Sequence, residues 1–395
     1  MEVMGMRNST IFLLSTLAIA VLSSNAVAQS DEKPGLFATA DASIVHDDNI
    51  YRVIDDLAQS DTYLRLRPEL AAVGGLGKHR FQLSYNGDYA KFSDQSDADY
   101  TDHDLRGRID FDHTLRFSSQ FEAGYQKEHE EPGTLNRVQL DVTEYNKYDQ
   151  NFVLAGLAYG SEEAIGRLAV NYRRTDKDYT NNELDFLDYL GNQFTGRFTY
   201  RVAPNTRVYA EAIISDLDYT PGINFELDNT YKRYRAGVTW DFTGKLTGDI
   251  NIGYQDRDYD LDTIQDIDGL AYDGEITWAL NTYTRVIVAA NRESIDSSLE
   301  EAGGFLRTTY GLSINHELTE RLKLIADAGY SNDELVFSSN REDKRYAYQF
   351  GLEYELLRNV ALAVDYTYEE RDSTLAIADY KANIFGLNVI VALED

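Results

Sequence analysis

The sequence predicts an all-β fold, a single antiparallel β-barrel of about eighteen strands. Three observations predict it: strict alternation of apolar and polar side chains, hairpins that recur at a nearly fixed interval, and no long apolar segment after the N-terminal leader. Alternation is clearest from Ala347 to Tyr368, where Phe350 and Leu352 lie on one face and Glu353 on the other. Period 2 on both arms of this hairpin indicates two strands, each with one apolar and one polar face.

The same hairpin recurs along the chain. Short turns are expected near residues 115, 203, 243, 281, 319 and 357, and at Gly74–Gly75 and Gly160–Ser161. Their spacing of roughly 38 to 46 residues is typical of a repeat architecture. A propeller has a similar period, but the chain lacks its Gly-His and Trp-Asp signatures, and a propeller would not place long acidic connections at one end only.

Taken in order, each predicted strand is a run of alternating residues that ends at a turn or a polar connection. The ranges are Leu36–Val45, Thr62–Val73, Phe81–Phe92, Leu105–Asp112, Phe117–Lys127, Tyr148–Tyr159, Arg167–Arg174, Gln193–Tyr200, Arg207–Leu217, Lys232–Phe242, Leu246–Tyr254, Ala271–Leu280, Thr284–Glu293, Phe305–Leu318, Leu322–Leu335, Tyr346–Leu356, Val360–Glu370 and Lys381–Leu393.

The apolar faces of these strands begin and end in large aromatic residues, as expected where a strand crosses a lipid bilayer. One girdle is predicted just before the short turns, at Phe111, Tyr200, Trp240, Trp278 and Tyr354, and a second farther along, at Tyr125, Tyr172, Tyr254, Tyr330 and Tyr366. The sequence therefore predicts a transmembrane barrel with short periplasmic turns and longer acidic outer loops.

The N-terminus has the pattern of a secretion signal. Arg7 precedes an apolar run from Ile11 to Leu22, and Ala26-Val27-Ala28 forms a small-residue cleavage site. We expect residues 1–28 to be a Sec signal peptide, cleaved near Ala28, and residues 29–395 to form one barrel domain. A leader followed by amphipathic strands indicates the outer membrane of a Gram-negative bacterium.

The net charge of -30 disfavours nucleic acid as a partner, because phosphates would be repelled. The expected neighbours are outer-membrane lipid and lipopolysaccharide. The six histidines form no spaced metal or triad pattern, so we predict no catalytic residue, no metal site, no cofactor and no enzymatic activity. Asp256, Asp258, Asp260 and Asp262 alternate and could contact one calcium ion, although Leu261 replaces the glycine of an EF-hand loop.

Alternation also predicts which charged side chains face the lumen. A basic wall is expected on the earlier strands, from Arg65, Arg67, Arg80, Arg106, Arg108, Arg167, Arg173, Arg197, Arg201, Arg233 and Arg235. An acidic wall is expected on the later strands, from Asp249, Asp273, Glu275, Asp327, Glu353, Glu355, Asp365 and Glu369. Opposed walls would set up a transverse field; alternatively, the charges solvate a wide lumen or pair across neighbouring strands.

The segment from His46 to Arg52 follows the first strand, and its Asp48, Asn49 and Tyr51 resemble a motif near the start of the putative beta-barrel porin 2 family. Ala363–Ser373 is also similar to the family pattern. The resemblance implies an outer-membrane barrel encoded with exopolysaccharide or capsule biosynthesis genes. It further implies that the barrel serves polysaccharide export or is a general pore. Export would involve saccharide chains as cargo and a periplasmic polysaccharide-export partner.

The predicted function is a porin-like channel that exports exopolysaccharide or capsular polysaccharide. Two alternatives stay open: a general or substrate-selective diffusion porin, and a plugged structural or adhesive barrel. A diffusion porin predicts a constriction loop folded into the lumen, for which Glu128–Glu144 is the longest candidate. An adhesive barrel predicts binding through the acidic loops and no conductance.

Overall fold

The computed structural model describes residues 34–133, 144–220, 227–242, 244–296, 303–335 and 341–394, and these residues form one barrel. The expected leader, residues 1–28, lies outside the described residues. The strands are β1 (Gly35–Asp47), β2 (Asp61–Leu76), β3 (His79–Phe92), β4 (Tyr100–Asp112), β5 (Phe117–His129), β6 (Lys147–Tyr159), β7 (Gly166–Tyr179), β8 (Tyr189–Ala203), β9 (Thr206–Tyr219), β10 (Asn229–Asp241), β11 (Leu246–Tyr259), β12 (Ile267–Ala279), β13 (Thr284–Asp296), β14 (Gly304–Thr319), β15 (Leu322–Leu335), β16 (Glu342–Leu357), β17 (Val360–Ser373) and β18 (Tyr380–Glu394).

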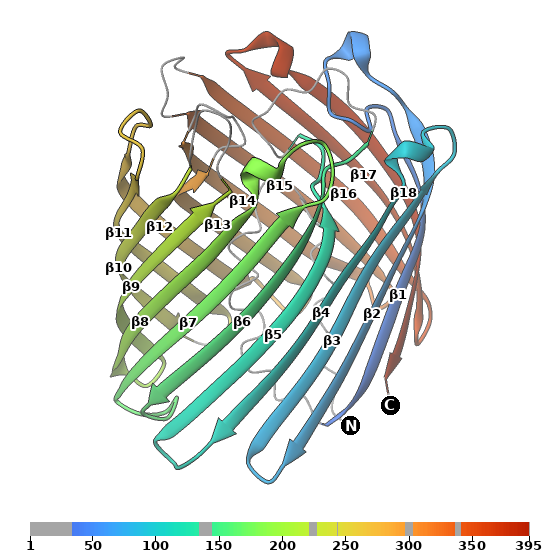
Figure 1. The fold of residues 1–395 in the computed structure, drawn as a ribbon. Coiled ribbons are helices and arrows are strands. Elements are labelled where there is room, and N and C mark those ends of the chain that lie inside the picture. Colours follow the sequence, from blue (N-terminus) through green and yellow to red (C-terminus); the bar gives the residue numbers. More distant parts are fainter. Residues whose placement is uncertain are drawn as a thin grey trace.

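The described strands form an 18-stranded antiparallel sheet, which confirms the predicted fold class. Each strand pairs with its neighbours in the chain, and β1 pairs with both β2 and β18, so the sheet closes on itself (Figure 1). Closure leaves no strand edge with unpaired backbone groups. Figure 1 also shows the short turns at the end where β1 begins and β18 ends, and the long connections at the other end.

The short turns lie close to their predicted positions, with one correction. Gly74 and Gly75 do not form a turn, because they pair with Phe81 and Arg80 inside the β2–β3 ladder. The chain reverses instead at Gly77, whose φ of 64° is left-handed and suits glycine. Two glycines in a strand therefore gave a false turn signal, and β2 extends to Leu76.

The pairing register separates an outer face from an inner face. Residues that pair across the ladder share a face, and these faces alternate along each strand. Leu64 of β2 is 61% exposed and pairs with Ile44 of β1, which is 51% exposed, so both face outward. Followed around the barrel, this register places both predicted aromatic girdles on the outer face, where Tyr and Trp suit a membrane interface.

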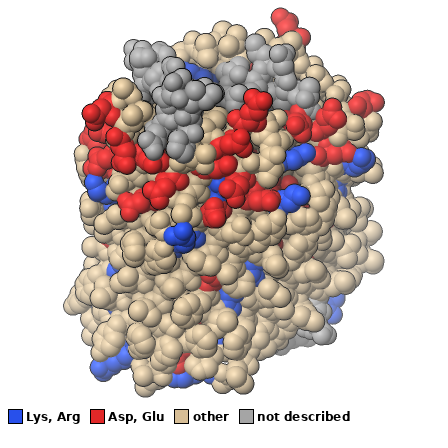
Figure 2. Space-filling view, viewed as in Figure 1, with Lys and Arg blue, Asp and Glu red and all other residues tan. Residues whose placement is uncertain are grey.

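The described parts of the outer connections contain four 3₁₀ turns, η1 (Asp55–Leu57), η2 (Ser96–Ala98), η3 (Asp185–Leu187) and η4 (Ala376–Ala378). Figure 2 shows acidic side chains gathered in a band at this end of the barrel, above a zone with few charges. No helix among the described residues is long and apolar enough to cross a membrane.

Candidate channel lumen and mouth

All residues of the two predicted walls lie on the inner face of the barrel according to the pairing register. Arg67 of β2, for example, pairs with Asp41 of β1, and both belong to the alternate set opposite to Leu64 and Ile44. Neither wall carries charges of one sign only, however, because each contains charges of the opposite sign.

Arginines on the first strands are neutralised by carboxylates on the same or the next strand. Arg67 lies 3.0 Å from Asp41, and Arg65 forms a bidentate ion pair with Asp88. On β4 two further arginines each pair with a carboxylate two residues away. Arg106 lies 2.6 Å from Asp104, and Arg108 lies 2.9 Å from Asp110. Planar guanidinium groups favour such two-pronged contacts.

A second network joins β8 to β11. Glu211 of β9 forms ion pairs with Arg197 at 2.9 Å and with Arg235 at 2.6 Å, and it also accepts a hydrogen bond from Arg235, so one buried carboxylate holds two cations. Arg197 also lies over the ring of Tyr209, whose hydroxyl donates to Asp249 at 2.7 Å. This network connects the predicted basic wall to the first residue of the predicted acidic wall.

The remaining arginines of this wall are less tightly held. Arg233 lies 3.8 Å from Glu293, while Arg167 and Arg201 each lie 3.3 Å from glutamates of the β6–β7 turn. Arg173 stacks on Phe152, with 3.9 Å from its guanidinium carbon to the ring centroid. Among the described residues, Arg80 and Arg173 form no ion pair with a carboxylate.

Two carboxylates of the predicted acidic wall contact amide side chains. Asp365 accepts from the Asn388 side chain at 2.6 Å, and Asp273 accepts from Asn251 at 3.2 Å. Within the described part of the chain, Glu275, Asp327, Glu353 and Glu355 form no ion pair with an arginine or lysine. Glu369 is different, because it pairs with Arg52. Four carboxylates on this side of the middle lumen are therefore not neutralised by an ion pair among the described residues.

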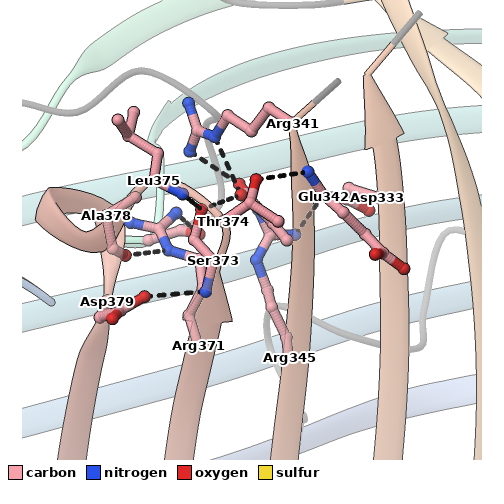
Figure 3. Close-up of polar contacts among 12 residues, drawn as sticks. Asp333, Arg341, Glu342, Arg345, Arg371, Ser373, Thr374, Leu375, Ala378 and Asp379 are labelled. Atoms are coloured by element: carbon pink, nitrogen blue, oxygen red, sulfur yellow. Dashed lines mark hydrogen bonds and ion pairs between the residues drawn. The ribbon is translucent and has the colours of Figure 1, made fainter. Parts of the chain in front are cut away.

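Near the outer end, the same strands carry arginines that sequence reasoning missed. Arg345 lies 2.8 Å from Asp333, which also pairs with Arg307 at 2.7 Å. Arg341 pairs with Asp343 at 2.7 Å, and Arg371 donates to the carbonyl of Ala378 at 2.5 Å (Figure 3). The predicted strands stopped at Tyr346 and Glu370, whereas β16 and β17 extend to Glu342 and Ser373. Extending the alternation past the membrane-spanning region would have placed these arginines inward.

The motif at the end of β1 closes the seam between the first and last strands. Backbone and side-chain N–H groups of Asn383 on β18 both donate to the Asp48 carboxylate at 2.7 Å. The buried Asn49 side chain donates to the carbonyl of Lys381 at 3.0 Å and to that of Val53 at 2.6 Å. Tyr51 packs beneath the outer loops. Asp48 and Asn49 therefore have a structural role, because they join the end of the first strand to the last strand.

Arg52 completes this seam contact. Its φ of 54° turns the chain back, and its guanidinium lies 2.8 Å from both Asp47 of β1 and Glu369 of β17. Burial alone would lower the pKa of Arg52, but the two carboxylates raise it well above its ordinary value. The loop after β1 is thereby fixed to β17 and β18.

The described ends of the connection between β5 and β6 contact strands and loops on another side of the mouth. Gly133 lies against the ring of Tyr380 on β18, and its carbonyl accepts from Arg371 on β17 at 3.4 Å. On the return side, the Tyr145 hydroxyl donates to the carbonyl of Ile50 in the loop after β1, at 3.0 Å. Residues 134–143 of the predicted constriction loop lie outside the described residues, but both of its described ends turn toward β1 and its neighbours.

A second segment folds inward on the other side of the mouth. Pairing of β12 with β13 stops at Tyr272 and Arg292, although β13 continues to pair with β14 as far as Asp296. Arg257, on the inner face of β11, reaches Asp296 at 2.6 Å and the Ser294 hydroxyl at 2.9 Å. The outer end of the β13–β14 hairpin has therefore left the wall and covers the inner face of β11.

Apolar side chains hold these inward segments. One cluster lies under the loops near β7 to β12 and includes Leu184, Leu227 and Ile267, each at most 1% exposed. Asp188 in this region accepts from the backbone N–H of Tyr179 at 2.6 Å, while burial raises the pKa of Asp188 to about 6. The mouth is thus narrowed by packed loops.

The aspartates considered for calcium do not converge on one point. Asp258 of β11 pairs with Lys232 on the outer face at 2.6 Å, and Asp260 lies in the following loop. Among the residues that the structure describes, no group of three or more histidines and carboxylates could hold a metal ion.

Solved structures with the same architecture are outer-membrane channels. They include OccAB3 of Acinetobacter baumannii, with 11% identity and a TM-score of 0.51 over 91% of this chain and 99% of that chain. Pseudomonas aeruginosa OccK2 (OpdF), crystallised with glucuronate, has 10% identity and a TM-score of 0.52 over 91% and 98%. Pseudomonas aeruginosa OpdK with vanillate has 11% identity and a TM-score of 0.50 over 91% and 99%.

At such low identity these likenesses show the fold alone. No curated protein matches the chain in sequence. The model of one protein family does match, over residues 36–393, which is nearly the whole barrel. The chain is therefore a porin-like outer-membrane barrel and belongs to the family described as Putative beta-barrel porin 2.

Proposed function

We propose that this barrel is a diffusion porin for small hydrophilic solutes. The observation that supports the proposal best is the inward fold of the β5–β6 connection, whose Gly133 contacts β17 and β18. A loop that reaches over the mouth limits the size of solute that can enter, while a lumen lined by charged and amide side chains suits hydrated solutes. An 18-stranded barrel is wide enough that side chains alone do not fill it.

Polysaccharide export, which the family resemblance implied, is the alternative. A polymer needs a continuous wide path, and the folded mouth argues against one. None of the proteins named above is described as moving a polysaccharide. The same structure also leaves room for the plugged barrel, which would conduct no ions.

The proposal is tested by solute flux in liposomes that contain the purified barrel. We expect swelling with monosaccharides and with glucuronate, falling steeply for longer oligosaccharides. Replacing residues 131–144 by a short turn should raise both single-channel conductance and the size limit. The matched control replaces the β12–β13 turn at residues 280–283 by another short turn, which lies at the opposite end of the barrel and should leave the size limit unchanged.

Three results would count against the proposal. Absence of conductance would favour the plugged barrel, and passage of long oligosaccharides by the unaltered protein would favour polysaccharide export. An unchanged size limit after loop replacement would show that the β5–β6 connection does not constrict the channel.

A further inference from the structure

The lipid-facing surface is indented across β2 to β7. A groove of about 1050 Å³ lies there, and its lining is almost wholly apolar. Its floor includes small outward-facing residues of β2, β4, β5 and β6, namely Ala72, Gly74, Gly107, Ala123 and Ala155, and β3 contributes Phe81 and Leu83 to the lining. Inward-facing residues line the groove only with their main-chain atoms. The groove therefore opens to the outside of the barrel.

The groove lies within the membrane-spanning zone. Its lining includes Tyr172, which belongs to the aromatic girdle near the loop end, called here the outer girdle. It also includes Ile109, which lies two residues before Phe111 of the girdle beside the short turns and on the same face of β4. A concave apolar surface between the two girdles faces the hydrocarbon core of the bilayer. Another copy of this chain would present a convex barrel wall, which cannot fill a groove, whereas flexible hydrocarbon chains can.

A polar cluster stands at the outer end of the groove. The Tyr172 hydroxyl donates to the Asn192 side-chain oxygen at 2.8 Å, and the Arg174 guanidinium donates to the same atom at 3.3 Å. Arg174 pairs across the ladder with Val153, which lines the groove. The Arg174 side chain is exposed. Among the charged residues on the lipid-facing side of β7 it lies nearest the middle of the membrane, since Asp176 and Asp178 lie closer to the loop end of the strand.

The charge of Arg174 is not neutralised within the described residues, where it forms no ion pair. Several other outward-facing cations at this end of the barrel form ion pairs, namely Lys91 with Asp99, Lys232 with Asp258 and Lys381 with Glu370. A long cationic side chain beside the outer girdle extends toward lipid headgroups, where phosphate is the anion it meets. Guanidinium groups bind phosphate with charge-assisted hydrogen bonds.

We propose that this groove binds a phosphorylated, multiply acylated glycolipid of the outer leaflet, the lipid A part of lipopolysaccharide. Its acyl chains lie along the small-residue floor, and one phosphate contacts Arg174. The position of Arg174 at the loop end assigns the phosphate contact to the outer leaflet. This inference goes beyond solute passage, and channel conductance is not expected to depend on it.

Native mass spectrometry of the purified barrel, titrated with lipid A, dephosphorylated lipid A and phosphatidylethanolamine, tests the proposal. Lipid A should bind best. Arg174→Gln should weaken its binding roughly tenfold, as expected for loss of one charged hydrogen bond, and should remove the preference for the phosphorylated form. Ala123→Phe, which fills the floor, should weaken binding of both forms.

Matched controls place the same changes elsewhere on the outer face. Lys381→Gln on β18 and Ala210→Phe on β9 should leave lipid A binding unchanged. Heat-modifiable gel mobility shows that each barrel is folded, and Gly107→Leu is the second groove variant if Ala123→Phe fails to fold. Equal binding of lipid A and phosphatidylethanolamine would overturn the proposal. So would equal losses in the controls, or a dimer that Ala123→Phe abolishes, which would assign the groove to a second copy.

Discussion

The seam between β1 and β18 depends on Arg52, and its replacement by methionine should destabilise the barrel strongly. The Arg52 side chain is 9% exposed and lies 2.8 Å from each of two carboxylates, Asp47 and Glu369, which are 6% and 7% exposed. Removing one partner of a buried ion pair leaves an uncompensated buried charge and typically costs about 3–5 kcal/mol. Here two carboxylates lose their cation, so we expect Arg52→Met to lower the free energy of unfolding by at least about 3 kcal/mol.

The assay is guanidinium chloride unfolding of the barrel in lipid vesicles, followed by tryptophan fluorescence, since the chain contains only 2 tryptophans, Trp240 and Trp278. Heat-modifiable gel mobility gives an independent measure of the folded barrel. The double variant Arg52→Met/Glu369→Leu should recover part of the loss, because one of the uncompensated carboxylates is then absent. Arg174→Gln, at an exposed site without an ion pair among the described residues, is the matched control and should change stability by about 0.5 kcal/mol or less.

A loss below about 1 kcal/mol for Arg52→Met would refute the reasoning, because that is the range of exposed ion pairs. No recovery in the double variant would show that Glu369 is not the partner whose burial matters. Either result would mean that the loop after β1 can detach from β17 at little cost.

Three further predictions address the faces, the mouth and the lumen. Val364→Arg on the outer face should cost about 2–4 kcal/mol, whereas Ala363→Arg on the inner face should cost much less, and equal losses in vesicle unfolding would refute the assignment of faces. Burial raises the pKa of Asp188 to about 6 in the folded protein, above the ordinary value near 3.8. Between these two pH values the folded state binds a proton that the unfolded state has lost, so the stability of the barrel should fall as the pH rises from about 3.8 to about 6. Asp188→Asn should flatten that part of the stability–pH curve, and an unchanged curve would exclude Asp188 as its source. Changing Arg65, Arg67, Arg106 and Arg108 together to Gln should shift the reversal potential in planar bilayers toward cations, since their carboxylate partners lose their counter-charges, and neutral amides at Glu353, Glu355 and Asp365 should shift it the other way. Both shifts should shrink at 1 M salt, where the Debye length is about 3 Å, and absence of either shift at low salt would show that these charges do not bias ion passage.

Alternation in the sequence determined the strands and their two faces. Because the side-chain period of a strand is 2, the positions of Val364 and Ala363 follow from the sequence once the strand is recognised. Register errors flip whole strands. In this chain the register shifts lie beside short turns, at Glu317/Thr319, Glu355/Leu357 and Arg201/Ala203, so the alternation along the rest of each strand is preserved. The predicted barrel, its strand number and the girdles therefore needed no tertiary information.

Positions at the outer ends of strands were harder to predict. Arg345 and Arg371 lie on β16 and β17 beyond the aromatic girdle, where the apolar face that marks a strand in the sequence gives way to polar residues. Gly74 and Gly75 gave a turn signal, although the left-handed conformation is adopted by Gly77. At Gly74 and Gly75, backbone pairing with the neighbouring strand overrides the local preference of glycine for a turn.

Only the tertiary structure decided which charges neutralise one another and what the motif near Asp48 does. Arg235 pairs with Glu211 because β10 and β9 are in register, and Asp48 meets Asn383 because the sheet closes after a full turn of the barrel. These residues are far apart in sequence, and no local period encodes their contact. The inward turn of the β13–β14 hairpin toward Arg257 likewise results from packing at the mouth, where loops bury apolar side chains against the inner wall.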